Sequence, residues 1–195
     1  MTTTETTTQD HAQEQDAAQY SSIVDMLAAV GCDFDRLQEL RDEREELAEA
    51  VTDAEETHKE AQEARTGDID TWHALKDARE ALAAWDEENA EELAELEEAA
   101  GDCDDEEDAR QRIQEDPLSV EVRSDWASPG EELTAGEFCI LLCTGGPAVR
   151  IRGELDGGTP CRAWLEYQDW GTPWTQYFEA DSATLCEYAG HFFFE

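Results

Sequence analysis

The feature that most restricts the fold is a heptad repeat that begins at Leu37. Its members recur at alternating spacings of three and four residues, the pattern of a helix that packs along one stripe. A helix of about 30 residues forms a rod of roughly 45 Å. So narrow a stripe does not stabilise a lone helix in water, and the repeat therefore predicts a partner helix. The first stripe consists of Leu37, Leu40, Arg44, Leu47, Val51, Ala54, His58 and Ala61.

A second helical stripe of similar length follows a predicted turn at residues 66–68. The short link and the matching lengths predict an antiparallel helical hairpin, or coiled coil. A parallel homodimer through either stripe is the competing arrangement. Gly31 and Gly101 mark helix ends, and Asp33 is a predicted N-cap between them. The second stripe consists of Trp72, Leu75, Ala78, Leu82, Trp85, Asn89, Leu93 and Leu96.

The character of the chain changes at Pro117. Up to that residue there are 38 acidic and 9 basic residues, whereas residues 118–195 hold 13 acidic and 4 basic residues. The later part has most of the β-branched and aromatic residues, and Asp181 is placed to cap a last helix. A buried strand is predicted at residues 138–143, and alternating strands are predicted at residues 118–123, 148–155 and 161–168. The strands from Phe138 onward are expected to form an antiparallel meander.

The sequence thus predicts three regions. Residues 1–18 are polar without periodicity and are expected to form a disordered tail. Residues 19–116 are expected to form the acidic helical arm, with a short helix near residues 106–114. Residues 117–195 are expected to form a small domain. The predicted fold class is α+β: an N-terminal antiparallel helical hairpin, then a small antiparallel sheet with one packed C-terminal helix.

Charge and cysteine usage exclude several classes of function. A formal net charge of -38 disfavours direct binding to nucleic acid or to an anionic membrane. No apolar run approaches the roughly 20 residues that cross a bilayer, and the N-terminus does not resemble a signal peptide, so a cytoplasmic protein is expected. The six cysteines contain no CxxC pair and are expected to be free thiols.

No metal, cofactor or catalytic site is expected. Cys139 and Cys143 should share a face of one strand about 13 Å apart, too far to bind one ion. Cys186 and His191 lie five residues apart, so on a helix they point to different sides. Carboxylates are too abundant to identify a catalytic pair. A non-enzymatic protein is therefore predicted.

An acidic run supports a more specific hypothesis. In residues 86–108, 14 of 23 residues are acidic and none is basic. One continuous helix there would extend about 35 Å and carry roughly one charge per 2.5 Å, against one per about 1.7 Å of duplex DNA. Such a rod could occupy a DNA-binding cleft, although acidity that serves solubility or salt adaptation explains the same composition. The predicted acidic face consists of Glu87, Glu88, Glu91, Glu92, Glu95, Glu97 and Glu98.

Aromatic residues crowd the segment from Trp164 to Phe178. Trp170 and Trp174 flank a predicted bend, where large amphipathic rings are typical of a contact surface. We expect Trp164 and the terminal phenylalanines to lie in the core. A small ligand-binding or enzymatic β domain around the two loop tryptophans is a further alternative.

Residues 137–156 and 162–178, together with residues 19–30 and 33–51, resemble a family of uncharacterised proteins associated with proteobacterial mobile elements. The resemblance implies a phage, plasmid or anti-defence setting and supplies no functional residues. The leading interpretation is an acidic protein–protein interaction module, a DNA mimic whose arm binds a basic DNA-binding protein such as a nuclease, a restriction or CRISPR effector, or a nucleoid protein. The alternative is a coiled-coil adaptor whose charge maintains solubility.

Overall fold

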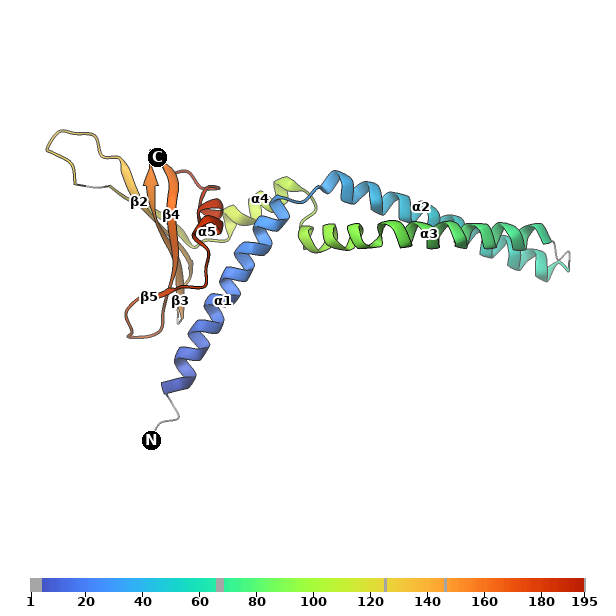
Figure 1. The fold of residues 1–195 in the computed structure, drawn as a ribbon, viewed down its shortest axis with the longest axis horizontal. Helices are drawn as coiled ribbons and strands as arrows, with labels where there is room; N and C mark the ends of the chain where they lie inside the picture. The colour runs from blue at the N-terminus through green and yellow to red at the C-terminus, as the bar shows by residue number, and fades with distance from the viewer. Residues whose placement is uncertain (1–4, 66–68, 125, 146, 195) are drawn as a thin grey trace. The chain divides into compact units, whose positions relative to one another are not determined.

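The computed structural model describes residues 5–65, 69–124, 126–145 and 147–194 (Figure 1). The chain forms two compact units. One comprises Cys32–Asp102, and the other comprises Met1–Gly31 together with Cys103–Glu195. The predicted turn at residues 66–68 lies outside the described residues, as do the first four residues of the predicted tail.

The unit Cys32–Asp102 is a helical hairpin of α2 (Phe34–Glu63) and α3 (Ile69–Ala100). Arg36 near the start of α2 contacts Glu92 near the end of α3, and Glu55 near the end of α2 contacts Arg79, so the helices are antiparallel. Asp33 caps α2 by accepting a hydrogen bond from the Arg36 backbone N–H at 3.0 Å. The antiparallel hairpin and this cap confirm the sequence prediction.

The larger unit contains one five-stranded sheet in the order β1-β2-β3-β4-β5. Every neighbouring pair is antiparallel, which confirms the predicted meander. The strands are β1 (Ser119–Ser124), β2 (Ala135–Cys143), β3 (Ala148–Asp156), β4 (Thr159–Gln168) and β5 (Thr175–Tyr177).

Helices cover one face of this sheet. Helix α1 (Glu5–Val30) packs against β4, α5 (Ser182–Ala189) and α4 (Glu106–Glu115), and α5 also packs on β4. Tyr20 on α1 accepts a hydrogen bond from the Asp181 backbone N–H at 3.0 Å, and Tyr188 on α5 donates one to Asp116 at 2.7 Å. The core beneath the helices includes Ile23, Met26, Ile113, Phe138, Ile140, Ile151, Leu165 and Leu185.

The division into units differs from the predicted one. Helices α1 and α4 were expected in the helical arm, yet both belong to the unit that holds the sheet. The physical reason is that Ile23 and Met26 of α1 and Ile113 of α4 are buried in the core of the sheet. Residues 5–18 were expected to be disordered, whereas the structure has them in the first half of α1.

Asp16 is one reason why the sequence did not predict a helix in the first half of α1. Its side chain lies one helical turn before Tyr20, on the stripe that continues to Ile23, and its exposed fraction is 0%. Neither carboxyl oxygen has a hydrogen-bond partner in the described chain. Burial raises the pKa of Asp16 from 3.8 to about 7. An acidic residue at a packed position interrupts the apolar pattern from which a helix is predicted.

One glycine is required by close packing. In β3, Gly153 lies opposite Phe138 on β2 and Ala163 on β4. A Cβ atom at this position would collide with the Phe138 ring and with the Arg162 carbonyl oxygen. The missing side chain therefore provides the space that the Phe138 ring occupies in the core.

Candidate functional site

The predicted acidic face lies on the C-terminal half of α3, and all seven of its glutamates are exposed. Two of them form ion pairs with arginines of α2. Glu92 accepts two hydrogen bonds from the guanidinium of Arg36, each at 3.0 Å, and Glu97 accepts one from Arg41 at 3.3 Å. The hydrogen bonds from Arg36 lower the pKa of Glu92. The carboxylates of Glu92 and Glu97 are therefore engaged within the protein.

Other arginines of the hairpin lie at the same junction between the helices. Arg44 on α2 contacts Asp86 at 2.9 Å, and Arg79 on α3 contacts Glu55 at 2.6 Å. These pairs are exposed, so each contributes little net stability. Their main effect on the surface is to concentrate positive charge along the junction and leave the outward side of α3 acidic.

The remaining glutamates form an unneutralised surface, which we call the outer five. Within the described part of the chain none of them forms an ion pair. At 1.5 Å per residue they are distributed over about 17 Å, or roughly one carboxylate per 3–4 Å, close to the phosphate spacing along one DNA strand. The hairpin as a whole, residues 32–102, holds 26 acidic and 7 basic residues. The outer five are Glu87, Glu88, Glu91, Glu95 and Glu98.

The acidic run at residues 86–108 is not one helix, contrary to the assumption behind its predicted length. Helix α3 ends at Ala100, Gly101 adopts a φ of 57°, and α4 starts at Glu106 after the N-cap Asp105. Residues from Cys103 onward also belong to the other unit. The rigid acidic surface on α3 is therefore limited to residues 86–100.

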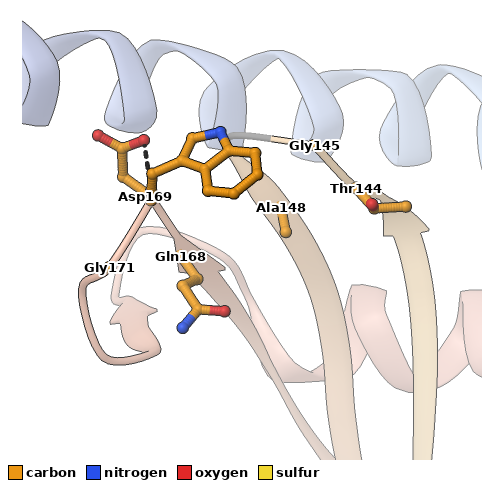
Figure 2. A pocket seen from close by; sticks show the side chains of 7 residues that line it. Thr144, Gly145, Ala148, Gln168, Asp169 and Gly171 are labelled. Atoms are coloured by element: carbon orange, nitrogen blue, oxygen red, sulfur yellow. Dashed lines mark hydrogen bonds between the residues drawn. The ribbon is translucent and has the colours of Figure 1, made fainter.

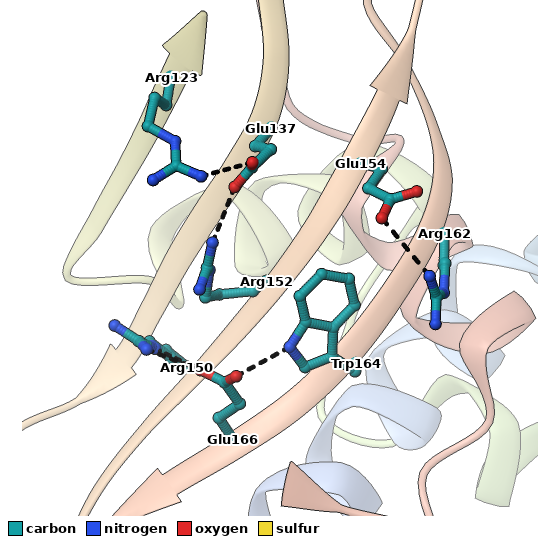
Figure 3. A network of polar contacts seen from close by, with 8 residues as sticks. All are labelled: Arg123, Glu137, Arg150, Arg152, Glu154, Arg162, Trp164 and Glu166. Carbon is teal, nitrogen blue, oxygen red and sulfur yellow. Dashed lines mark hydrogen bonds and ion pairs between the residues drawn. The ribbon is translucent and has the colours of Figure 1, made fainter. Parts of the chain in front are cut away.

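The face of the sheet away from the helices carries a second distinctive surface, which we call the open face (Figure 3). Residues 118–195 contain four basic residues apart from His191, and all are arginines of this face. Arg152 and Arg123 both contact Glu137, Arg150 contacts Glu166 at 2.7 Å, and Arg162 contacts Glu154 at 3.5 Å. Each arginine has an acidic partner, so the face is a ladder of opposite charges.

Two tryptophans pack onto this ladder. Trp174 stacks on the Arg150 guanidinium, which lies 3.8 Å from the ring centroid. Trp164 lies between Arg152 and Arg162 and donates a hydrogen bond from Nε1 to Glu166 at 2.9 Å (Figure 3). Trp164 was expected in the core and instead lies on the open face, because it alternates with the buried Ala163 and Leu165.

Trp170 occupies a different place from Trp174. It is 81% exposed and follows β4 in a turn that Thr172 closes through a backbone hydrogen bond to Asp169 at 3.1 Å. Trp170 lines a hollow of ≈ 280 Å³, and other residues that line this hollow are labelled in Figure 2. Trp174 is not among the residues that line this hollow, so the two tryptophans do not share it. The hollow is lined by Thr144, Gly145, Ala148, Gln168, Asp169, Trp170 and Gly171.

The cysteines of β2 differ from the expected arrangement. The pairing of β2 with β3 shifts between Leu141 and Cys143, so Cys143 pairs with the buried Val149 and packs against the core. Cys139 pairs with Arg152 on the open face. The two thiols thus lie on opposite faces rather than the same one. Burial raises the pKa of both thiols, which keeps them protonated at neutral pH.

Comparisons with known proteins add no assignment. No protein-family model, curated protein or solved structure matches the chain. The resemblance to a family of mobile-element proteins therefore stays a prediction. None of the helices in the described ranges is both long enough and apolar enough to cross a membrane.

Proposed function

We propose that the protein is a non-enzymatic interaction module that binds a basic, DNA-binding protein through the outer five glutamates of α3. The observation that supports this most directly is the sorting of charge within the hairpin. Arg36, Arg41 and Arg44 are paired at the junction of the two helices, and the outer five are exposed without cationic partners among the described residues. In this proposal the partner is displaced from DNA, in the cytoplasm of a cell that carries a mobile element.

Helical support makes these carboxylates a suitable mimic of phosphate. Glutamates on a helix hold a regular spacing, so fewer degrees of freedom are lost when the partner binds. The hairpin supplies the second helix that a single acidic helix would need to remain folded. The contact should also weaken steeply with salt. Added salt screens the attraction between the two charged surfaces and reduces the gain from releasing their counterions on binding.

The experiment is a pull-down from bacterial lysate at roughly 0.1 M salt, followed by elution with duplex DNA. We expect a DNA-binding protein to be retained by the wild-type chain and released by the DNA. A variant with the outer five changed to Gln should lose it. Glu92 and Glu97 stay unchanged, because their neutralisation would remove contacts with Arg36 and Arg41.

The matched control removes the same charge from the other helix. Glu45, Glu46, Glu49, Glu56 and Glu60 of α2 are exposed and form no ion pair within the described ranges. A variant with these five glutamates changed to Gln should still retain the DNA-binding protein. Loss of binding with both variants would instead indicate a nonspecific effect of net charge, and retention by both would rule out the outer five as the contact.

A structural adaptor is the second candidate, favoured by one observation on the same hairpin. Trp72 is 49% exposed and Ile69 is 68% exposed, although Leu75 on the same helix is buried. A depression of ≈ 290 Å³ beside α3 is lined by Trp72, Leu75, Lys76, Arg79, Glu80 and Ala83. A partner helix could complete this thin interface. Trp72→Glu should then abolish partner retention while the outer-five variant preserves it.

A further inference from the structure

The outer edge of β1 has no neighbouring strand within the described chain. β1 stands first in the sheet and pairs only with β2. An edge strand presents backbone N–H and C=O groups that can pair with another strand. Figure 3 shows Arg123 on this strand, reaching inward to Glu137 on β2.

Apolar side chains gather at the same edge. Val120 and Val122 point to the helix-covered side, since they pair with Ile140 and Phe138, yet they are 38% and 48% exposed. Helices therefore shield the centre of the sheet but not β1. Five of the eleven exposed large apolar residues in the described chain lie between residues 118 and 133: Leu118, Val120, Val122, Trp126 and Leu133.

The charges on β1 are complementary to their own copy. Glu121 and Arg123 lie two residues apart on the open face. Suppose that the β1 strands of two copies pair antiparallel about a twofold axis at Val122. Glu121 of each copy then lies opposite Arg123 of the other copy. The same register brings the two Val122 side chains together on the other face. Opposite charges and apolar pairs directly across strands both stabilise a sheet.

The geometry points to a homodimer in which β1 of one copy pairs antiparallel with β1 of a second copy, with Val122 at the axis, to form one ten-stranded sheet. The interface is isologous, because the same patch serves both copies. It lies in the unit that holds the sheet and does not depend on the outer five.

Other registers are less favourable. An axis at Glu121 places like charges opposite each other, and an axis at Arg123 does the same. An axis at Val120 leaves Glu121 opposite Ser119 and Arg123 opposite Pro117, which has no backbone N–H to donate.

The overall charge makes the dimer dependent on salt in a specific direction. Each chain carries -38, so two copies repel each other at long range, and salt screens that repulsion. Dimerisation should therefore strengthen as salt rises. Binding by the outer five should weaken under the same change, so the failure of one proposal is distinguishable from the failure of the other.

Sedimentation equilibrium of the full chain at roughly 0.05 and 0.5 M salt tests the dimer. We expect a monomer–dimer equilibrium that shifts toward dimer at the higher salt. Glu121→Arg places two arginines opposite each other and should weaken dimerisation at least about tenfold. Glu187→Arg on α5 changes the net charge by the same amount at an exposed position and should not weaken it. A wild-type chain that is monomeric at both salt concentrations overturns the proposal, as does equal weakening by the two variants.

Site-specific oxidation tests the register. In the proposed pairing the two Val122 residues face each other with Cβ atoms about 5 Å apart, so Val122→Cys should form a covalent dimer beyond the wild-type background. The two Val120 residues are four positions apart along the strands, about 13 Å, so Val120→Cys should not. A crosslink at Val120 instead of Val122, or at neither, overturns this pairing.

Discussion

Burial of Asp16 makes the stability of the sheet-bearing unit depend on pH near neutrality. The side chain is fully buried on α1, and its carboxyl group accepts no hydrogen bond in the described chain. The ionisable groups whose pKa its charge raises include Tyr177 and Cys143, neither of which is a cation. Ionisation of Asp16 therefore costs free energy that no side chain in the described part of the chain compensates.

The magnitude follows from the change in pKa. Because the folded-state pKa of Asp16 is raised from 3.8 to about 7, the unfolded chain releases this proton first. The contribution of Asp16 to the free energy of unfolding is therefore fully present below about pH 4 and is lost as pH rises through about 7. A gap of roughly three pH units corresponds to about 4 kcal/mol, an upper value if residues 5–18 undock locally at a lower cost.

The assay is urea unfolding of wild type and Asp16→Leu at pH 5 and pH 8, followed by circular dichroism. At pH 8 the variant should be more stable than wild type by up to about 4 kcal/mol, and at pH 5 the difference should shrink by more than half. Asp25→Leu, on the exposed side of the same helix, is the control and should give a difference that does not vary with pH. Equal pH dependence in wild type and Asp16→Leu would refute the reasoning.

Three further outcomes follow from particular contacts. Gly153→Ala should destabilise the protein by about 1–3 kcal/mol in urea unfolding, because the added methyl group collides with the Phe138 ring; no loss would mean that the ring can move aside. Tyr188→Phe should cost about 1–3 kcal/mol in the same assay, since the buried hydroxyl donates to Asp116 at 2.7 Å. Neutralising the outer five with Gln should raise the melting temperature at low salt and leave it unchanged at high salt, because it relieves repulsion on α3; a drop at both would show that these glutamates stabilise the hairpin.

A substantial part of the fold was predictable from local pattern. The heptad repeat from Leu37 and the helical stripe from Trp72 predicted both long helices, and Asp33 and Asp181 act as the N-caps that their positions predicted. The strands follow from alternation that the structure confirms. These features depend on side chains a few residues apart, so the sequence contains the information directly.

The candidate surfaces were only partly predictable. The seven glutamates of α3 are exposed as expected, yet nothing local indicates that Glu92 and Glu97 contact arginines about 56 residues away. Trp164 could have been assigned to the open face, since it alternates with Leu165 and shares its parity with Arg162 and Glu166. The prediction placed Trp164 in the core because its ring is large and apolar. The alternation of side chains along the strand indicated its position correctly.

The sequence by itself determined the two long helices, the antiparallel strands, the helix caps and the acidic character of α3, because each results from spacing and composition along a short stretch of chain. Only the tertiary structure decided that α1 and α4 join the sheet, that Asp16 is buried and that β1 is left as an uncovered edge. Which face of a sheet is covered, and by which helix, depends on contacts between residues far apart in the chain, where the free energy of burying apolar surface is realised only after the elements meet.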